Sequence, residues 1–314
     1  MRFRGRTLRR YGENPFARAD QTGSRTLAFR AIALGRFLLF AVLALALLKL
    51  LGFLAGLLHL NIRTLYWSAI FGNAQVVIAS LGATAIMARI DGRSFAAYGL
   101  EDERWLRRFV LGAACGFVAL TVLLVAMRLS GAYSFGSAQT HGIALAEFAL
   151  VYAALFFIVA FSEETLFRGY ALVALAESIS FWPAAIILGL IFGLSHSHHA
   201  AESHAGLIFA GLYGVVLSYS FRRGCSLWFA FGLHAMWDYS ESFIYGVPDS
   251  GVVVPGCWLA PKIHGPLWLT GGSVGPEGSY LMIFVLAGLM LAAHKLLRPA
   301  GGAQLVPQNQ KMAH

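Results

Sequence analysis

Three ionisable side chains interrupt an apolar run near the middle of the chain. Glu163, Glu164 and Arg168 follow a stretch of apolar residues from Phe148 to Phe161. An ionisable group at the centre of a membrane helix costs roughly 2.5–3.5 kcal/mol on insertion, so such groups persist when they pair, face a wet cavity or do chemistry. Glu164 and Arg168 are four residues apart and can form an ion pair on one helix face. Glu163, rotated about 100° from Glu164, has no such local partner, and we expect it to face a cavity.

Histidines interrupt two later apolar segments. His196 follows Gly189 and Gly193, whose small face would let another helix approach closely. His234 and Asp238 are four apart, so the carboxylate can reach and orient the imidazole. A membrane histidine is often a packing residue, and a neutral His–Asp pair can simply hold helices together. Three polar sets on three different helices favour a common site instead.

These side chains are the parts needed to hydrolyse an amide bond. A carboxylate can be the base for a buried water, and polar donors can stabilise the developing oxyanion. Serine chemistry is disfavoured because neither Ser162 nor Ser195 lies in a GxSxG turn. Two mechanisms stay open: a metal-free glutamate base, or zinc or another divalent metal held by His196, His234 and Glu163. The chain has no HExxH motif, which slightly favours a metal-free or weakly metal-dependent site.

The composition is that of a polytopic membrane protein. Of the 314 residues 58% are hydrophobic and only 12% are charged, against about 25% charged in soluble domains. Since about 20 apolar residues span a bilayer, we expect an all-α membrane bundle of about eight transmembrane helices. The candidate spans are 34–58, 65–88, 108–129, 143–166, 183–200, 205–221, 226–245 and 279–297.

The placement of basic residues predicts the topology. With the N-terminus inside, most Lys and Arg side chains fall on the cytoplasmic side, and Arg63 and Lys262 fall on the outer side. Both termini are therefore expected in the cytoplasm. The net charge of +9 is explained by this asymmetry, so no nucleic-acid partner is predicted. We expect the fourth helix to run on past Arg168 toward Ala176, so that the three polar sets converge in the cytoplasmic half to the middle of the membrane.

The flanking regions divide the chain. Residues 1–30 are predicted to be a flexible basic arm that touches anionic lipid, 31–298 the transmembrane bundle with a catalytic core at 143–246, and 299–314 a flexible tail. The segment 246–278 is rich in Gly and Pro and is expected to lie on the outer membrane surface as an aromatic loop or a lid. A surface metal site at His198, His199 and His204 is only weakly indicated, because their spacing fits no standard ligand pattern.

Three motifs follow one another along the chain, each on a different predicted helix: Glu163-Glu164-x-x-x-Arg168, Phe192-x-x-x-His196 and His234-x-x-x-Asp238. In this order they resemble the motifs of the CPBP family of intramembrane proteases. This family comprises the CAAX prenyl endopeptidases and bacterial bacteriocin-processing and self-immunity proteins. The resemblance covers roughly residues 143–246 and implies a helical membrane endopeptidase that cleaves near the membrane.

The resemblance also implies a role for each motif residue. Glu163 would activate the water, His196 would help to hold it, and His234 would stabilise the oxyanion. Glu164 with Arg168 would brace the site.

Asp238 departs from the family pattern, because many relatives have Asn at this position. An ionised Asp cannot donate a hydrogen bond to an oxyanion. We therefore expect Asp238 to orient His234 or to help bind a metal.

The predicted partners are the lipid bilayer and a peptide or membrane-protein substrate. The Arg-rich composition suggests a bacterial plasma membrane, where a leader peptide or a membrane-protein tail is the expected substrate, rather than a prenylated CAAX peptide. Two other classes remain: a catalytically silent scaffold or immunity protein, and an ion-coupled transporter that uses the buried charges as a relay. A transporter would be expected to show repeated halves or matched broken helices, and the sequence shows neither.

Overall fold

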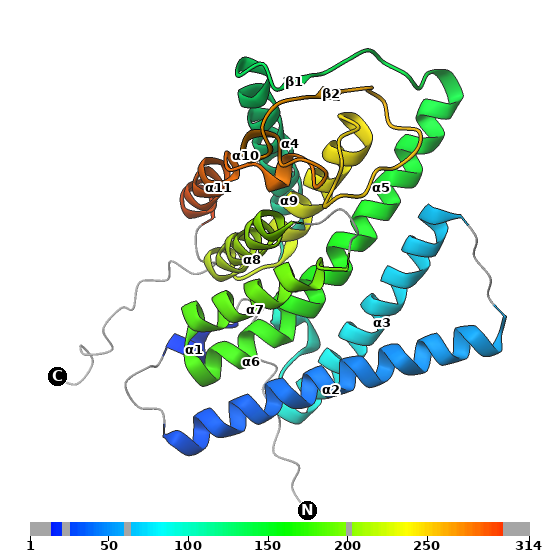
Figure 1. Cartoon of the computed structure of the whole chain (residues 1–314). Helices are drawn as coiled ribbons and strands as arrows, with labels where there is room; N and C mark the ends of the chain where they lie inside the picture. Colours follow the sequence, from blue (N-terminus) through cyan, green and yellow to red (C-terminus); the bar gives the residue numbers. More distant parts are fainter. Residues whose placement is uncertain (1–13, 21–25, 60–63, 199–202, 298–314) are drawn as a thin grey trace, which may run out of the picture.

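A computed structural model describes residues 14–20, 26–59, 64–198 and 203–297, and these form a mostly helical bundle (Figure 1). The α-helices are α1 (Ala17–Asp20), α2 (Leu27–Leu57), α3 (Leu65–Asp91), α4 (Trp105–Leu129), α5 (Gly142–Glu164), α6 (Tyr170–Ile179), α7 (Phe181–Ser195), α8 (His204–Gly224), α9 (Trp228–Asp238), α10 (Leu267–Thr270) and α11 (Met282–Leu296). Two π-helical turns, η2 (Thr165–Gly169) and η3 (Tyr239–Ile244), and two 3₁₀ turns, η1 (Phe95–Tyr98) and η4 (Pro276–Gly278), connect them.

The prediction of a helical membrane bundle is confirmed, and each predicted span overlaps a helix. Among the described residues, five helical stretches are long and apolar enough to cross a membrane: α2, α3 from Tyr66, α4, the continuous stretch Gly142–Ile179, and α8. The apolar helices α7 and α11 are shorter. Along α2 only Ala33, Phe40 and Ala44 are buried, so most of its apolar surface points outward, as expected of a helix that faces lipid.

The fourth predicted helix continues past Arg168, as expected. α5 passes through the π-turn η2 directly into α6, which gives one helical stretch of 38 residues ending at Ile179. The hydroxyl of Thr165, the first residue of this wider π-turn, donates to the carbonyls of Phe161 and Ser162, to which its backbone N–H also donates. Glu163 and Glu164 therefore lie well inside the stretch.

Glycines allow the closest helix contacts in the bundle. A Cβ at Gly232 of α9 would overlap the carbonyl of Phe109 on α4, and one at Gly112 would overlap the carbonyl of Phe229. The predicted close approach at Gly189 and Gly193 is also confirmed, because Cβ atoms there would overlap backbone atoms of α8. These contacts fix α7, α8 and α9, which carry or flank the predicted histidines.

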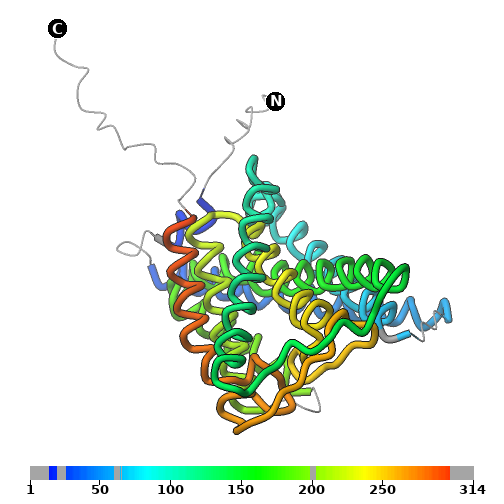
Figure 2. Tube along the Cα trace, turned by 90° about the horizontal axis from the view of Figure 1, so that it is seen from above, coloured from blue at the N-terminus to red at the C-terminus, as the bar shows by residue number. Residues whose placement is uncertain are grey.

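One end of the bundle is covered by two irregular segments, 130–141 and 246–278, which we call the β-linked cap. The two-residue strands β1 (Tyr133–Ser134) and β2 (Lys262–Ile263) pair antiparallel and join them. Figure 2 shows these segments together at one end, with α4, α8 and α11 side by side. Trp258 and Trp268 of the cap are 41% and 54% exposed, which suits residues at a membrane interface.

Part of the predicted flexible arm is packed against the bundle. Phe16 has no exposed surface, and its ring meets those of Phe181 and Phe221 at centroid distances of 5.6 and 5.0 Å. α2 begins at Leu27, earlier than the predicted residue 34. Residues 1–13 and the predicted tail 299–314 lie outside the described residues.

Candidate active site

Glu164 links the first motif to the third. Its Oε1 atom lies 3.0 Å from Nη1 of Arg168, so the predicted ion pair is confirmed, and 2.9 Å from Nδ1 of His234. Glu164, Arg168 and His234 are 0%, 1% and 5% exposed. Because Glu164 accepts from both groups, it fixes the imidazole orientation from another helix. The sequence had assigned this orienting role to Asp238.

The second nitrogen of His234 faces two more carboxylates. Nε2 lies 3.6 Å from Oε2 of Glu163 and 3.6 Å from Oδ2 of Asp238, distances of charge contact rather than of a direct hydrogen bond. The Glu163 side chain is 26% exposed, more than the side chains of Glu164, His234 and Asp238. Glu163 is thus the carboxylate most open to a substrate or a water.

His196 is positioned differently from the prediction. It caps the C-terminal end of α7 instead of lying inside the helix, and its Nδ1 atom is 2.8 Å from the carbonyl of Phe192. The ring of Phe192 contacts both histidines, with centroid distances of 4.9 Å to the ring of His196 and 6.1 Å to the ring of His234. The guanidinium carbon of Arg168 lies 4.2 Å from the same ring centroid, a cation–π contact. Phe192 therefore packs the second motif against the other two.

A cavity of about 270 Å³ connects these side chains. Glu163, His196, His234 and Asp238 all line it, whereas Glu164 and Arg168 lie behind the wall. The structure therefore brings four of the six predicted residues to one cavity and places the other two as support.

The predicted zinc ligands do not adopt metal-binding spacing. His196, His234 and Glu163 do not form a group of ligand atoms within 4.8 Å of one another in the described part of the chain. One ring nitrogen of each histidine is also directed elsewhere, toward Phe192 and Glu164. The arrangement of His196, His234 and Glu163 therefore does not fit a zinc ion bound by all three.

Several polar residues of the cavity were not predicted from the sequence. Tyr213 of α8 packs its ring 5.7 Å from that of His234, and Asn73 of α3 accepts a hydrogen bond from Ser162 at 2.7 Å. Asp249 and Glu277 of the β-linked cap also line the cavity. Burial, together with the charges of Asp238 and Glu277, raises the pKa of Asp249 well above its ordinary value.

A third acid, Glu241, lies close to Asp249 and Glu277 without lining the cavity. Glu241 follows Asp238 by three residues within a predicted span, a spacing that a search for neighbouring carboxylates would detect. Asp249 and Glu277 lie in irregular segments, where no periodicity indicates which way a side chain points.

Comparison with known proteins adds one match. Residues 145–240 match a family model described as type II CAAX prenyl endopeptidase Rce1-like. No curated protein and no solved structure matches the chain. The matched stretch includes all six predicted site residues and ends before Glu241. The resemblance carried by the three motifs is therefore confirmed over residues 145–240, where this chain matches the Rce1-like CAAX prenyl endopeptidase family.

Proposed function

We propose that this chain is an intramembrane endopeptidase in which Glu163 activates a water for attack on a peptide bond. The main support is that Glu163 and His234 line the same cavity side by side, with Oε2 and Nε2 3.6 Å apart, while Glu164 accepts a hydrogen bond from the other ring nitrogen of His234. A general base and an oriented donor that line one cavity are what amide hydrolysis requires.

In the proposed reaction Glu163 takes a proton from the water as the water attacks the carbonyl carbon. Nδ1–H of His234 donates to Glu164, and Nε2 points into the cavity. Carboxylates near both ring nitrogens stabilise the doubly protonated imidazole, whose Nε2–H can donate to the oxyanion. Glu163 then returns its proton to the leaving amine.

His196 and Asp238 have supporting roles in this proposal. His196 lines the same cavity and helps to hold the attacking water. Asp238, which as a carboxylate cannot donate to an oxyanion, acts on His234 through its charge. We further propose that Glu163 works without a metal ion, because the histidines and Glu163 are not at metal-binding spacing within the described ranges.

The proposed setting is a bacterial plasma membrane, crossed eight times, with both termini in the cytoplasm. The short helices α7, α9 and α11 would then complete the crossings as part of the bundle. The proposed substrate is a leader peptide or a membrane-protein tail that enters from the bilayer, since a buried cavity among membrane helices is not open to folded soluble proteins.

The test is cleavage by the purified chain in lipid nanodiscs, with membrane-proximal peptides as substrates. Glu163→Ala and His234→Ala should abolish cleavage while circular dichroism and gel filtration stay unchanged. Glu147→Ala is the matched control, because Glu147 is an exposed acid on the same helix, α5. The zinc chelator 1,10-phenanthroline should leave cleavage intact.

Three results would contradict the proposal. Full cleavage by Glu163→Ala would show that Glu163 is not the general base. Inhibition by the zinc chelator, reversed by added zinc, would show that the reaction depends on zinc. A silent scaffold is indicated if the folded, unchanged chain cleaves no peptide and cells that carry Glu163→Ala have the same phenotype as cells that carry the unchanged chain.

A further inference from the structure

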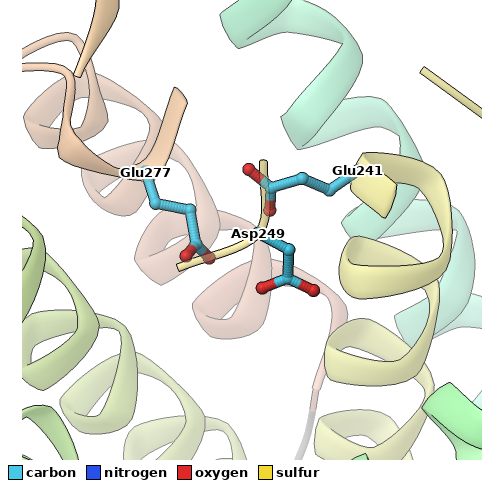
Figure 3. A group of neighbouring side chains, drawn as sticks. All are labelled: Glu241, Asp249 and Glu277. Atoms are coloured by element: carbon cyan, nitrogen blue, oxygen red, sulfur yellow. The ribbon is translucent and has the colours of Figure 1, made fainter. Parts of the chain in front are cut away.

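A second group of carboxylates lies beside the candidate active site. Glu241 comes from η3, Asp249 from the β-linked cap and Glu277 from η4 (Figure 3). One carboxylate oxygen from each lies within 4.8 Å of the other two. Glu277 is distant in sequence from Glu241 and Asp249, so the fold brings the third charge to the other two.

Glu241 is the part of this group that points to a ligand. The residue has no exposed surface, and neither carboxylate oxygen has a hydrogen-bond partner among the residues described. Its side chain is directed toward Asp249 and Glu277 (Figure 3). A buried, unsatisfied carboxylate is strongly unfavourable, so this geometry requires a proton or a cation to stabilise it.

Hydrogen-bond donors hold the other two carboxylates in place. The indole N–H of Trp237 donates to Oε1 of Glu277 at 3.0 Å, and the hydroxyl of Ser250 donates to its Oε2 at 2.7 Å. The hydroxyl of Ser242 donates to Oδ2 of Asp249 at 3.1 Å. Hydrogen-bond donors that orient the ligating carboxylates are typical of metal sites.

No basic side chain neutralises the group. In the described ranges, no Lys, Arg or His lies within ion-pair distance of Glu241, Asp249 or Glu277. The bundle elsewhere pairs its buried acids, as Glu164 is paired with Arg168.

We infer that Glu241, Asp249 and Glu277 form a binding site for a hard divalent cation, with Ca²⁺ as the preferred ion. Carboxylate oxygens are the ligands that such cations prefer. Ca²⁺ takes oxygens at about 2.3–2.6 Å, so ligands on opposite sides of it are about 4.6–5.2 Å apart. The three carboxylate oxygens lie within 4.8 Å of one another, so one Ca²⁺ ion can contact all three, and water can supply the remaining ligands.

The cation site goes beyond the proposed protease function. Asp249 and Glu277 line the same cavity as Glu163 and His234. A bound cation would tie η3, which directly follows the helix of His234, to both ends of cap segment 246–278. It would thereby hold the cap over the cavity.

The test is Ca²⁺ binding to the purified full-length chain after chelation with EGTA, and it needs no protease assay. Equilibrium dialysis with radioactive calcium should show about one ion per chain, and excess Ca²⁺ should raise the thermal unfolding midpoint by about 5 °C. Glu241→Gln and Asp249→Asn should abolish saturable binding and the shift. Ser250→Ala should weaken binding by about 10-fold, because it removes only an orienting donor.

Glu103→Gln, which alters an exposed acid outside the cavity, is the matched control and should bind normally. Absence of saturable binding by the unchanged chain would overturn the inference. Equal binding by Glu241→Gln and the unchanged chain would place the ion elsewhere and would also overturn it. If the unchanged chain shows no Ca²⁺-dependent shift and Glu241→Gln has a higher unfolding midpoint than the unchanged chain, the group is held neutral by protons, which also overturns the inference.

Discussion

Oε1 of Glu164 has partners from two directions. Arg168 is on its own helix and His234 comes from α9, yet both reach the same oxygen. A buried carboxylate shared in this way is sensitive to loss of either partner, because the remaining charge is left in a medium of low dielectric constant. The motif Glu-Glu-x-x-x-Arg thus combines one partly exposed carboxylate, the proposed base Glu163, with one buried carboxylate that contacts Arg168 and His234.

We predict that Glu164→Gln lowers the free energy of unfolding by about 3–5 kcal/mol, because it leaves the Arg168 guanidinium buried without its counter-charge. Cleavage should lose kcat with little change in KM, since His234 loses its orienting charge while the cavity keeps its shape. Unfolding in denaturant and steady-state kinetics measure the two effects. The double variant Glu164→Gln/Arg168→Met should recover stability but not kcat; recovery of both would show that Glu164 has no positioning role.

At the scale of elements, α9 is positioned by backbone contact with α4. Gly232 is two residues before His234, and a Cβ there would overlap the carbonyl of Phe109. Helix packing at this glycine therefore sets the depth and rotation of the imidazole.

We predict that Gly232→Ala destabilises the chain by about 1–3 kcal/mol and lowers cleavage, because the two helices must separate. Gly288→Ala is the matched control, since Gly288 lies in helix α11 with no atom within 4 Å of an added Cβ. This control should be neutral or stabilising by about 0.5–1 kcal/mol, the usual helix preference of Ala over Gly. Equal thermal midpoints for the two variants would contradict the packing argument.

A second junction holds α2, α3, η1 and α6 together at Asp91. Tyr98 donates to Oδ2 of Asp91 at 2.7 Å, Tyr170 donates to the same oxygen at 3.0 Å, and Nε of Arg36 lies 3.2 Å from Oδ1. Burial and the hydrogen bond to Asp91 raise the pKa of Tyr98 above its ordinary value. The neutral phenol is therefore the form that the fold stabilises.

We predict that Tyr98→Phe costs about 1.5–3 kcal/mol near neutral pH, because a hydrogen bond to a charged acceptor is lost. Since the folded pKa is raised, the contribution of Tyr98 is present below pH of about 10, the unfolded value, and is lost as pH rises above it. The variant should thus lose less stability than the unchanged chain between neutral and strongly alkaline pH. Tyr280→Phe, at a half-exposed position, is the control; an identical alkaline response of Tyr98→Phe and the unchanged chain would refute the assignment.

At the scale of the whole molecule, the sequence was sufficient to predict features that depend on residues close together in the chain. Apolar runs located the helices, and i,i+4 spacing identified the Glu164–Arg168 pair. Spacing could not show that Glu164 also reaches His234, since that contact crosses from one helix to another. Spacing also could not place His196 at the end of α7, because the length of an apolar run does not show at which residue a helix ends.

The β-linked cap was the least predictable region for the same reason. Its side chains follow neither the helical nor the strand period, so Asp249 and Glu277 gave no signal of direction. Their position depends on pairing between segments more than 100 residues apart, such as Tyr133 with Ile263.

The proposed topology makes a prediction for the entire chain. Single cysteines at Glu103 and Gln139, in a background without native cysteines, should be labelled from opposite sides by a membrane-impermeant thiol reagent. Glu103 should react only after the cytoplasmic side is opened, and Gln139 in intact cells, because an odd number of crossings separates them. Labelling of both from one side would contradict the eight-span arrangement.

The most direct measurement of the central claim compares protein termini in membranes from cells that carry the unchanged chain, Glu163→Gln or Glu147→Gln. We predict that at least one peptide terminus next to a membrane segment is present with the unchanged chain and the Glu147 control. That terminus should fall by about 100-fold or more with Glu163→Gln, the scale of a lost general base. An identical set of termini in all three membranes would contradict the assignment of this chain as an endopeptidase.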